Sequence, residues 1–440
     1  MEEYYIIPET LKFKRQFRFL IFCFFWLFLI VPLSFITGIL KDFVIIVNYI
    51  LIIFLPLWTY NKIFRKGIRY LPVKIKGLLK KVAIFILIYL FLMALQLVIN
   101  PHNTSLFSVR RLSVAVIPSI SLALLTAFYT FGSQKRQVLM IRVLFIILLF
   151  IVFFSAMGVG MDTTENTHQT YEVTREEGIV EQANEYGYFL ALLFALSVAG
   201  LSKHIRIISN KTIYIPILLF TFMLILRTGS YGAIVLSLMC SIPFLIKTSS
   251  IKNIVGMYVM IPAFVIVLWT GINIASAGAL NYKAKAFMDS ISKKSSTSVY
   301  EASTFLMRYE LIIGGIDKIL QKPIFGYGLS EGHAQRFTRN KFIKVHNAFI
   351  IESIKGGILV GFVILLFYWI ILKSTLQIKG SQGNKIIYSL LLFMFIADNL
   401  KTGFNFLSIS SGTMALSLLL IFLINNLSLT SDFLTTDKKR

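Results

Sequence analysis

The chain has 440 residues, of which 57% are hydrophobic, and its mean hydropathy is +0.77. A single water-soluble core cannot bury this much apolar surface, so the composition excludes an ordinary soluble protein and predicts a membrane protein. Lys and Arg total 44 against 20 Asp and Glu, a net charge of +24, but most of these basic residues lie in short loops between apolar runs. This distribution favours orientation in a membrane over binding of nucleic acid.

Apolar runs of about 20 residues are long enough to cross a bilayer as helices. About 12 such runs are predicted, at 19–38, 43–60, 82–100, 112–131, 138–157, 184–201, 213–227, 229–246, 253–272, 347–372, 386–400 and 406–426. Lys and Arg recur in alternate loops and at both termini, which the positive-inside rule assigns to the cytoplasm. We therefore expect an all-α polytopic membrane protein with both termini inside.

Three parts are predicted along the chain. Residues 1–272 hold transmembrane helices 1 to 9, residues 273–345 form one large extracytoplasmic loop, and residues 346–440 hold helices 10 to 12 and a cytoplasmic C-terminus. Within the loop, apolar residues recur at helical spacing from Phe305 to Leu320, which predicts an amphipathic helix that lies on the membrane or caps a cavity. Pro323 ends this helix, and glycines then permit a tight turn.

Three arginines stand on the outer side, where the charge rule disfavours them. Arg110 and Arg111 lie at the outer mouth of one span, and Arg227 ends another just before the polar break at 228–233. An anionic ligand would explain retained cations, and snorkelling to lipid headgroups is the alternative. Irregular backbone at membrane depth must be buried in protein or face water, so the break predicts a cavity. Asn184 begins a further span, where it either adds a polar group at this depth or caps the helix.

His346 and Asn347 stand where the outer loop meets the apolar run 347–372. A histidine at this boundary can take the proton of an acceptor hydroxyl, because its charge changes near neutral pH. The alternative is a histidine that only hydrogen bonds to a backbone carbonyl. The two cysteines fall inside apolar runs, so we expect no disulfide, and no metal cluster is expected either.

Two pairs follow inside the same run. Glu352 and Lys355 are three residues apart, and they are expected to neutralise each other on one helix face. Gly357 and Gly361 are four apart, a spacing typical of close helix packing.

Three stretches together resemble a known family. Pro323–Leu329 is similar to a turn with proline, two apolar residues and G-x-G, and Arg308 matches a loop arginine that precedes it. Residues 345–361 resemble a segment with HN, a short apolar run and G-I-x-G. Residues 228–233 resemble T-x-S-R-G-A, although Tyr231 stands at the arginine and Arg227 would have to replace it. These are motifs of the O-antigen ligase and polymerase superfamily of bacterial membrane glycosyltransferases.

The resemblance implies a GT-C-like membrane enzyme that works without metal, nucleotide sugar or other cofactor. It would transfer glycan from an undecaprenyl diphosphate carrier at the outer face of the bacterial cytoplasmic membrane. We expect His346 to be the catalytic base, and the expected substrate-binding residues are Arg308, Arg227, Arg110, Arg111, Asn347 and Asn184. Expected partners are the lipid-linked donor, a glycan or lipid-glycan acceptor, membrane lipids and a chain-length regulator, but no nucleic acid.

Several functions remain open at this point. A polymerase would join repeat units of O-antigen, capsule or exopolysaccharide, whereas a ligase would move finished polymer to lipid A core or another acceptor. Twelve spans also suit a transporter or flippase, but such carriers show related halves and ionisable groups near the bilayer midplane. This chain shows neither pattern. A non-catalytic assembly partner would keep the spans without needing His346.

Overall fold

The structure is a computed structural model, and it describes residues 13–30, 41–67, 71, 73–104, 106–131, 133–157, 183–201, 207–208, 210–228, 230, 232–237, 304–330, 333–336, 341–345, 347–376, 391–392, 394–397, 399, 414–421 and 423. This part of the chain is mostly helical. The chain forms two compact units. The first contains Met1–Ile147, Gly315–Ala334 and Phe342–Arg440, and the second contains Leu148–Gly314 and Gln335–Lys341. The predicted boundaries at 272 and 345 stay predictions.

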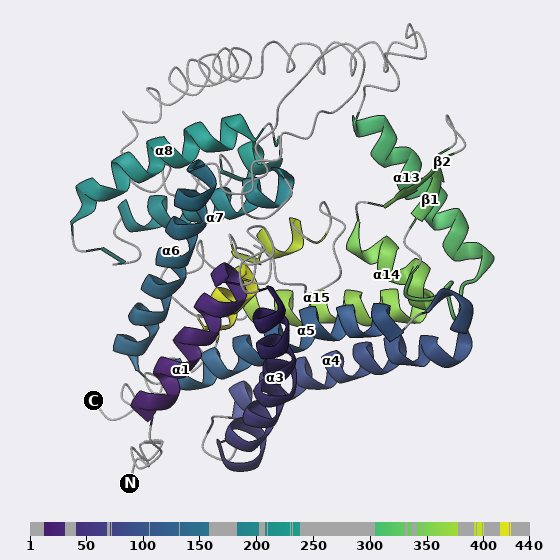
Figure 1. Cartoon of the computed structure of the whole chain (residues 1–440), viewed down its shortest axis with the longest axis horizontal. Helices are drawn as coiled ribbons and strands as arrows, with labels where there is room; N and C mark the ends of the chain where they lie inside the picture. The colour runs from purple at the N-terminus through teal and green to yellow at the C-terminus, as the bar shows by residue number, and fades with distance from the viewer. Residues whose placement is uncertain are drawn as a thin grey trace, which may run out of the picture. The chain divides into compact units, whose positions relative to one another are not determined.

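Apolar helices make up most of the described part of the first unit. They are α1 (Phe13–Phe25) with the π-helical turn η1 (Trp26–Ile30), α3 (Lys41–Thr59) with η2 (Tyr60–Gly67), α4 (Val73–Ile99) with the short η4 (Pro101–Asn103), α5 (Leu106–Thr130), α14 (Ala348–Gly356) and α15 (Ile358–Leu376). In this unit α5 packs against α1, α3 and α4, while α4 also packs against α14 and α15 (Figure 1). Helix α6 (Gln134–Ala156) belongs to both units, as does α13 (Thr304–Gln321).

The second unit is built around α7 (Ala183–Leu201) and α8 (Tyr214–Arg227), which pack against each other after the short η6 (Lys211–Ile213). Glycines permit the close approach of the backbones here. A Cβ on Gly187 would lie 2.9 Å from the Cβ atoms of both Ser230 and Ala233, and one on Gly200 would meet the ring of Tyr214. Neither glycine position has room for a larger side chain without movement of its neighbours.

Four helices in the described ranges are long and apolar enough to cross a membrane, namely Asp42–Arg65, Ile75–Ile99, Lys135–Ser155 and Ile358–Thr375. Shorter apolar helices cover Ile120–Thr130, Tyr186–Leu201 and Tyr214–Ile225. The expectation of a helical membrane protein is confirmed in this coarse form. The count of about 12 spans stays a prediction, and the predicted span 253–272 lies wholly outside the residues that the structure describes.

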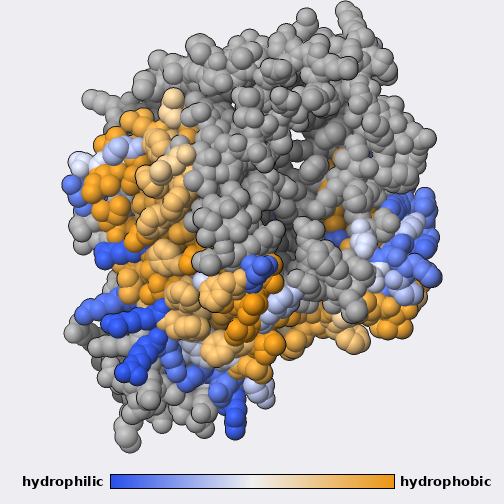
Figure 2. Space-filling model, viewed as in Figure 1, coloured by the Kyte–Doolittle hydropathy of each residue, from blue (hydrophilic) through white to orange (hydrophobic). Residues whose placement is uncertain are grey.

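Basic residues gather at one end of the first unit, as the alternation of loops requires. They belong to the start of α1, the end of η2 and the starts of α4 and α6, and they include Arg15, Arg18, Lys62, Arg65, Lys76, Lys80, Lys81, Lys135 and Arg136. Figure 2 shows blue residues at the lower left, next to the orange surface of the apolar helices. The positive-inside rule predicts this arrangement, in which basic residues collect on one side of a membrane. The assignment of that side to the cytoplasm stays a prediction.

The predicted single span 347–372 is wrong, because two helices occupy it. Helix α14 ends at Gly356, Gly357 adopts φ 82°, and α15 begins at Ile358. A helix of nine residues is about 13 Å long, too short to cross a hydrocarbon core of about 30 Å. Gly357 is therefore a helix break and not a helix-packing residue, whereas close helix packing is confirmed at Gly361, where a Cβ would collide with the Ser353 hydroxyl of α14.

The segment 304–345 contains both expected and unexpected elements. The predicted amphipathic helix is α13. Two short strands were not predicted, β1 (His333–Arg336) and β2 (Lys341–Lys344), which pair into a two-stranded sheet. Their basic sequences lack the alternation of apolar and polar residues by which a strand is recognised.

Candidate functional site

A tight glycine turn, Lys322–Ser330, connects α13 to the rest of the site. Gly326 and Gly328 have φ values of 65° and 100°, a region that favours glycine, as the sequence predicts. The backbone N–H of Tyr327 donates to Ile354 O at 2.8 Å, and that of Gly328 donates to Lys355 O at 2.9 Å. The last carbonyls of a helix have no partner within the helix, so the glycine turn supplies donors to the end of α14.

The other helices at this break are fixed to the same turn. Pro323 O accepts from Ile358 N, the first residue of α15, at 2.7 Å. Asn103 O accepts from Ser330 N at 2.9 Å, and Thr104 Oγ1 accepts from Leu329 N at 3.0 Å. The glycine turn is therefore held between the α4–α5 connection and the α14–α15 break, and it joins three segments that are far apart in the sequence.

We expect Gly357→Ala to loosen this junction. A Cβ at position 357 would collide with the carbonyl oxygen of Ile324, and this backbone conformation alone costs an L-residue about 1–3 kcal/mol. Thermal unfolding of the purified protein should show a clear destabilisation. Gly77→Ala is the matched control, because a Cβ there meets nothing within 4 Å and alanine favours a helix interior by about 1 kcal/mol. Equal stability of the two variants would contradict the prediction.

Asn347 begins α14 as its N-cap. Its backbone is extended, and its side-chain Oδ1 accepts from Ile350 N at 3.1 Å. Asparagine is among the preferred capping residues because its side chain satisfies a backbone donor of the first turn. Val345 and Ala348, which flank this position, are both buried. Asn347 therefore has a structural role, and its expected contact with substrate stays a prediction.

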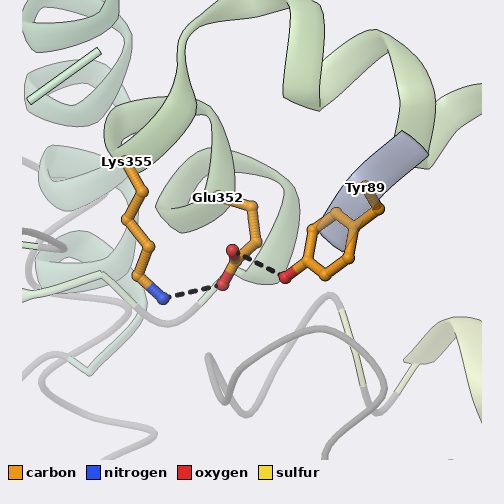
Figure 3. Close-up of polar contacts among 3 residues, drawn as sticks. All are labelled: Tyr89, Glu352 and Lys355. Carbon is orange, nitrogen blue, oxygen red and sulfur yellow. Dashed lines mark hydrogen bonds and ion pairs between the residues drawn. The ribbon is translucent and has the colours of Figure 1, made fainter. Parts of the chain in front are cut away.

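A buried polar network ties α14 to α4 (Figure 3). Tyr89 Oη donates to Glu352 Oε2 at 3.0 Å, and Lys355 Nζ pairs with Glu352 Oε1 at 2.8 Å. Glu352 is 0% exposed and Lys355 is 7% exposed. The predicted pairing of Glu352 with Lys355 is confirmed. Sequence reasoning missed Tyr89, for which the only signal was one hydroxyl inside a long apolar run.

The polar break after Arg227 is confirmed. Helix α8 ends at Arg227, and Thr228 Oγ1 donates to Ile225 O at 2.8 Å while it accepts from Ser230 N at 3.2 Å. Helix resumes at Gly232. Thr228 and Ser230 are both buried, so the irregular backbone at these two positions is surrounded by protein, as membrane depth would require. The Ser230 hydroxyl has no hydrogen-bond partner in the described ranges.

The other predicted site residues are located only by their position on a helix. Arg110 and Arg111 lie near the start of α5 in the first unit, whereas Arg227 ends α8, Arg308 lies in the first turns of α13 and Asn184 lies in the first turn of α7, all in the second unit. His346 lies outside the described residues, directly before the Asn347 cap. Convergence of the arginines on His346 stays a prediction. The structure brings together the glycine turn, α14 and the end of α4.

The described residues contain no group of three or more His, Cys, Asp or Glu side chains that could hold a metal ion. In comparisons with known proteins, no family model and no curated protein sequence matches the chain. The likeness to the O-antigen ligase and polymerase superfamily therefore rests on the three motifs alone.

Proposed function

We propose that this protein is a metal-independent membrane glycosyltransferase that takes glycan from an undecaprenyl diphosphate carrier. It would act at the outer face of a bacterial cytoplasmic membrane and polymerise repeat units of O-antigen, capsule or exopolysaccharide. One observation carries the proposal. Two of the family-like motifs, the glycine turn and the segment after His346, are joined by three backbone hydrogen bonds, Tyr327 to Ile354, Gly328 to Lys355 and Ile358 to Pro323.

In the proposed reaction, an acceptor hydroxyl attacks the anomeric carbon of the lipid-linked sugar. The new glycosidic bond forms as the bond from carbon to the diphosphate oxygen breaks, and the hydroxyl proton passes to His346. The leaving diphosphate departs with concentrated negative charge, which arginines stabilise through paired hydrogen bonds. The cap at Asn347 fixes the start of α14 directly after the proposed base.

The direct test uses the purified full chain in liposomes with an undecaprenyl diphosphate-linked oligosaccharide as donor. We expect longer lipid-linked glycans and free undecaprenyl diphosphate to appear together. Supplying the donor alone distinguishes the reactions, because a polymerase uses a second copy of it as acceptor and a ligase does not. A protein that moves the donor across the bilayer while its glycan stays unchanged would be a transporter, and the proposal would be wrong.

Arg227 and Arg308 are expected to bind the carrier diphosphate. A hydrogen bond to a charged group contributes about 1.5–3 kcal/mol, so each alanine variant should lose about 10- to 100-fold in transfer rate. Lysine keeps the charge but loses the planar fork, so Arg→Lys should recover only part of this loss where the contact is bidentate. Arg65→Lys is the control, since Arg65 lies at the basic end of the first unit. Arginine variants with the wild-type rate would refute the anion site.

A further inference from the structure

An exposed apolar surface spans the last turns of α13 and the start of the glycine turn. It consists of Ile316, Leu320, Ile324 and Phe325, which are 42%, 64%, 66% and 53% exposed, and we call it the apolar shoulder. The opposite side of α13 is occupied, because Leu311 and Ile319 are buried and Gly315 lies against Ile350. Ile316 and Leu320 therefore form a second apolar face of α13, separate from the one that packs into the protein, and Ile324 and Phe325 extend it into the glycine turn.

The exposed side of α13 is divided lengthwise. Ile316 and Leu320 are four residues apart and share one strip, while Asp317 and Gln321 share the next strip and are exposed as well. An apolar strip beside a polar strip is the pattern of a helix that lies in a membrane interface. A contiguous apolar strip of this kind is more informative than scattered apolar residues, which are common on water-exposed surfaces.

The apolar shoulder continues the exposed apolar surface of two apolar helices. Its residue Ile324 directly follows Pro323, whose carbonyl binds the first residue of α15. From that point Ile358, Leu359, Phe362, Leu365 and Trp369 are all at least half exposed along the candidate span. On the other side, Asn100 Nδ2 donates to Phe325 O at 3.4 Å, just beyond Val98 of α4, which is 77% exposed. A bilayer that surrounds α4 and α15 would therefore reach the shoulder.

Two lysines lie at the edge of this surface. The Nζ atoms of Lys318 and Lys322 are each 4.8 Å from the ring centroid of Tyr327, so both charges converge on one aromatic side chain. Asp317 is the only acidic residue of the segment 316–330, which leaves it basic. Figure 2 shows blue residues at the right, where Figure 1 places the end of α13, next to an orange surface. Lysine beside apolar residues is the usual arrangement at the level of lipid headgroups.

We propose that the apolar shoulder inserts into the bilayer interface and that Lys318 and Lys322 bind the phosphate of an anionic phospholipid there. Ile316, Leu320, Ile324 and Phe325 enter the acyl boundary, and the two ammonium groups stay among the headgroups. The bilayer surface then holds the glycine turn, and through it the α14–α15 break, at the depth of lipid phosphates. This inference depends on the chain spanning a membrane and is independent of glycosyl transfer.

Insertion is tested with single spin labels on the full chain in nanodiscs. In a background without the two native cysteines, a label replaces Leu320, Ile324 or Gln321 in turn. Labels at 320 and 324 should relax more strongly with oxygen than with a water-soluble nickel complex, as a label at Trp369 does. A label at 321, on the polar strip of the same helix, should show the reverse. If the nickel complex reaches 320 and 324 as readily as 321, the shoulder is not inserted.

Headgroup binding is tested with a fluorophore at Ile324 and lipids brominated on the acyl chain. Brominated phosphatidylglycerol should quench the fluorophore more than brominated phosphatidylcholine at the same mole fraction. An anionic surface attracts each nearby lysine by about five-fold in affinity, so Lys318→Gln with Lys322→Gln should remove the preference. Lys80→Gln with Lys81→Gln, at the opposite end of α4, should leave it unchanged. Equal quenching by the two lipids in the wild type would overturn the assignment.

The same assay distinguishes a phospholipid from the lipid carrier. Undecaprenyl phosphate and unlabelled phosphatidylglycerol are each added as competitors at matched mole fractions. We expect both lipids to displace brominated phosphatidylglycerol to an extent that depends only on their negative charge. Displacement by undecaprenyl phosphate at a much lower mole fraction would show that the surface selects the carrier, and the phospholipid assignment would then be wrong.

Discussion

Replacing His346 by alanine is expected to abolish detectable transfer. General-base assistance contributes about 10²- to 10⁴-fold to a reaction rate, and the nearest other histidine in the sequence is His333, thirteen residues earlier in β1. The buried start of α14 depends on Val345, Ala348 and the Asn347 cap, so expression and thermal stability should stay near the wild-type values. The measurement is the rate of product formation from a lipid-linked donor by the purified variant.

His346→Gln separates a base from a positioning residue. Glutamine keeps hydrogen-bonding groups but cannot accept a proton at neutral pH. A base therefore predicts inactivity in both variants, whereas activity of His346→Gln would assign the residue a structural role. Asn347→Ala is a useful companion, because loss of the cap costs about 1 kcal/mol of stability. Asn347→Asp should restore that stability, so the effect of the cap can be measured apart from the effect of the histidine.

Features set by residues close in sequence were predictable. The turn after Pro323 follows from glycines at 326 and 328, and their positive φ values confirm it. The pairing of Glu352 with Lys355 follows from their spacing on one helix face. The break after Arg227 follows from a polar run between apolar ones. In each case the physical cause lies within a few residues.

Features set by distant partners were not predictable. Gly357 resembled a helix-packing glycine, and only the carbonyls of Pro323 and Ile324, more than thirty positions earlier, show why the helix breaks there. Tyr89 gave no hint that it would meet a carboxylate of α14. Hydropathy cannot separate a nine-residue buried helix from the span that follows it, because both are uniformly apolar.

The same network leads to the largest expected effect on stability. Glu352→Ala should destabilise the protein by about 3–5 kcal/mol, because it removes the carboxylate that the buried Lys355 ammonium pairs with. Tyr89→Phe removes one hydrogen bond to that carboxylate and should cost less, about 1.5–3 kcal/mol. Thermal unfolding of the purified variants gives the order. Asp317→Ala is the matched control, since this exposed carboxylate should change stability by less than about 0.5 kcal/mol.

A double variant distinguishes the loss of an ion pair from the loss of packing. Glu352→Gln combined with Lys355→Met removes both charges while it keeps the volume, and replacing a buried pair by neutral residues is often tolerated. We expect this double variant to be more stable than Glu352→Ala. If it is equally unstable although the side-chain volume is kept, the charged pair itself holds α14 against α4 and the shape of the side chains does not suffice. If Glu352→Ala is as stable as Asp317→Ala, the network does not stabilise the fold. The rate of glycosyl transfer by the double variant should then show what the proposed site requires of α14. A wild-type rate would mean that only the position of α14 matters, and a reduced rate would mean that the charges of Glu352 and Lys355 matter as well.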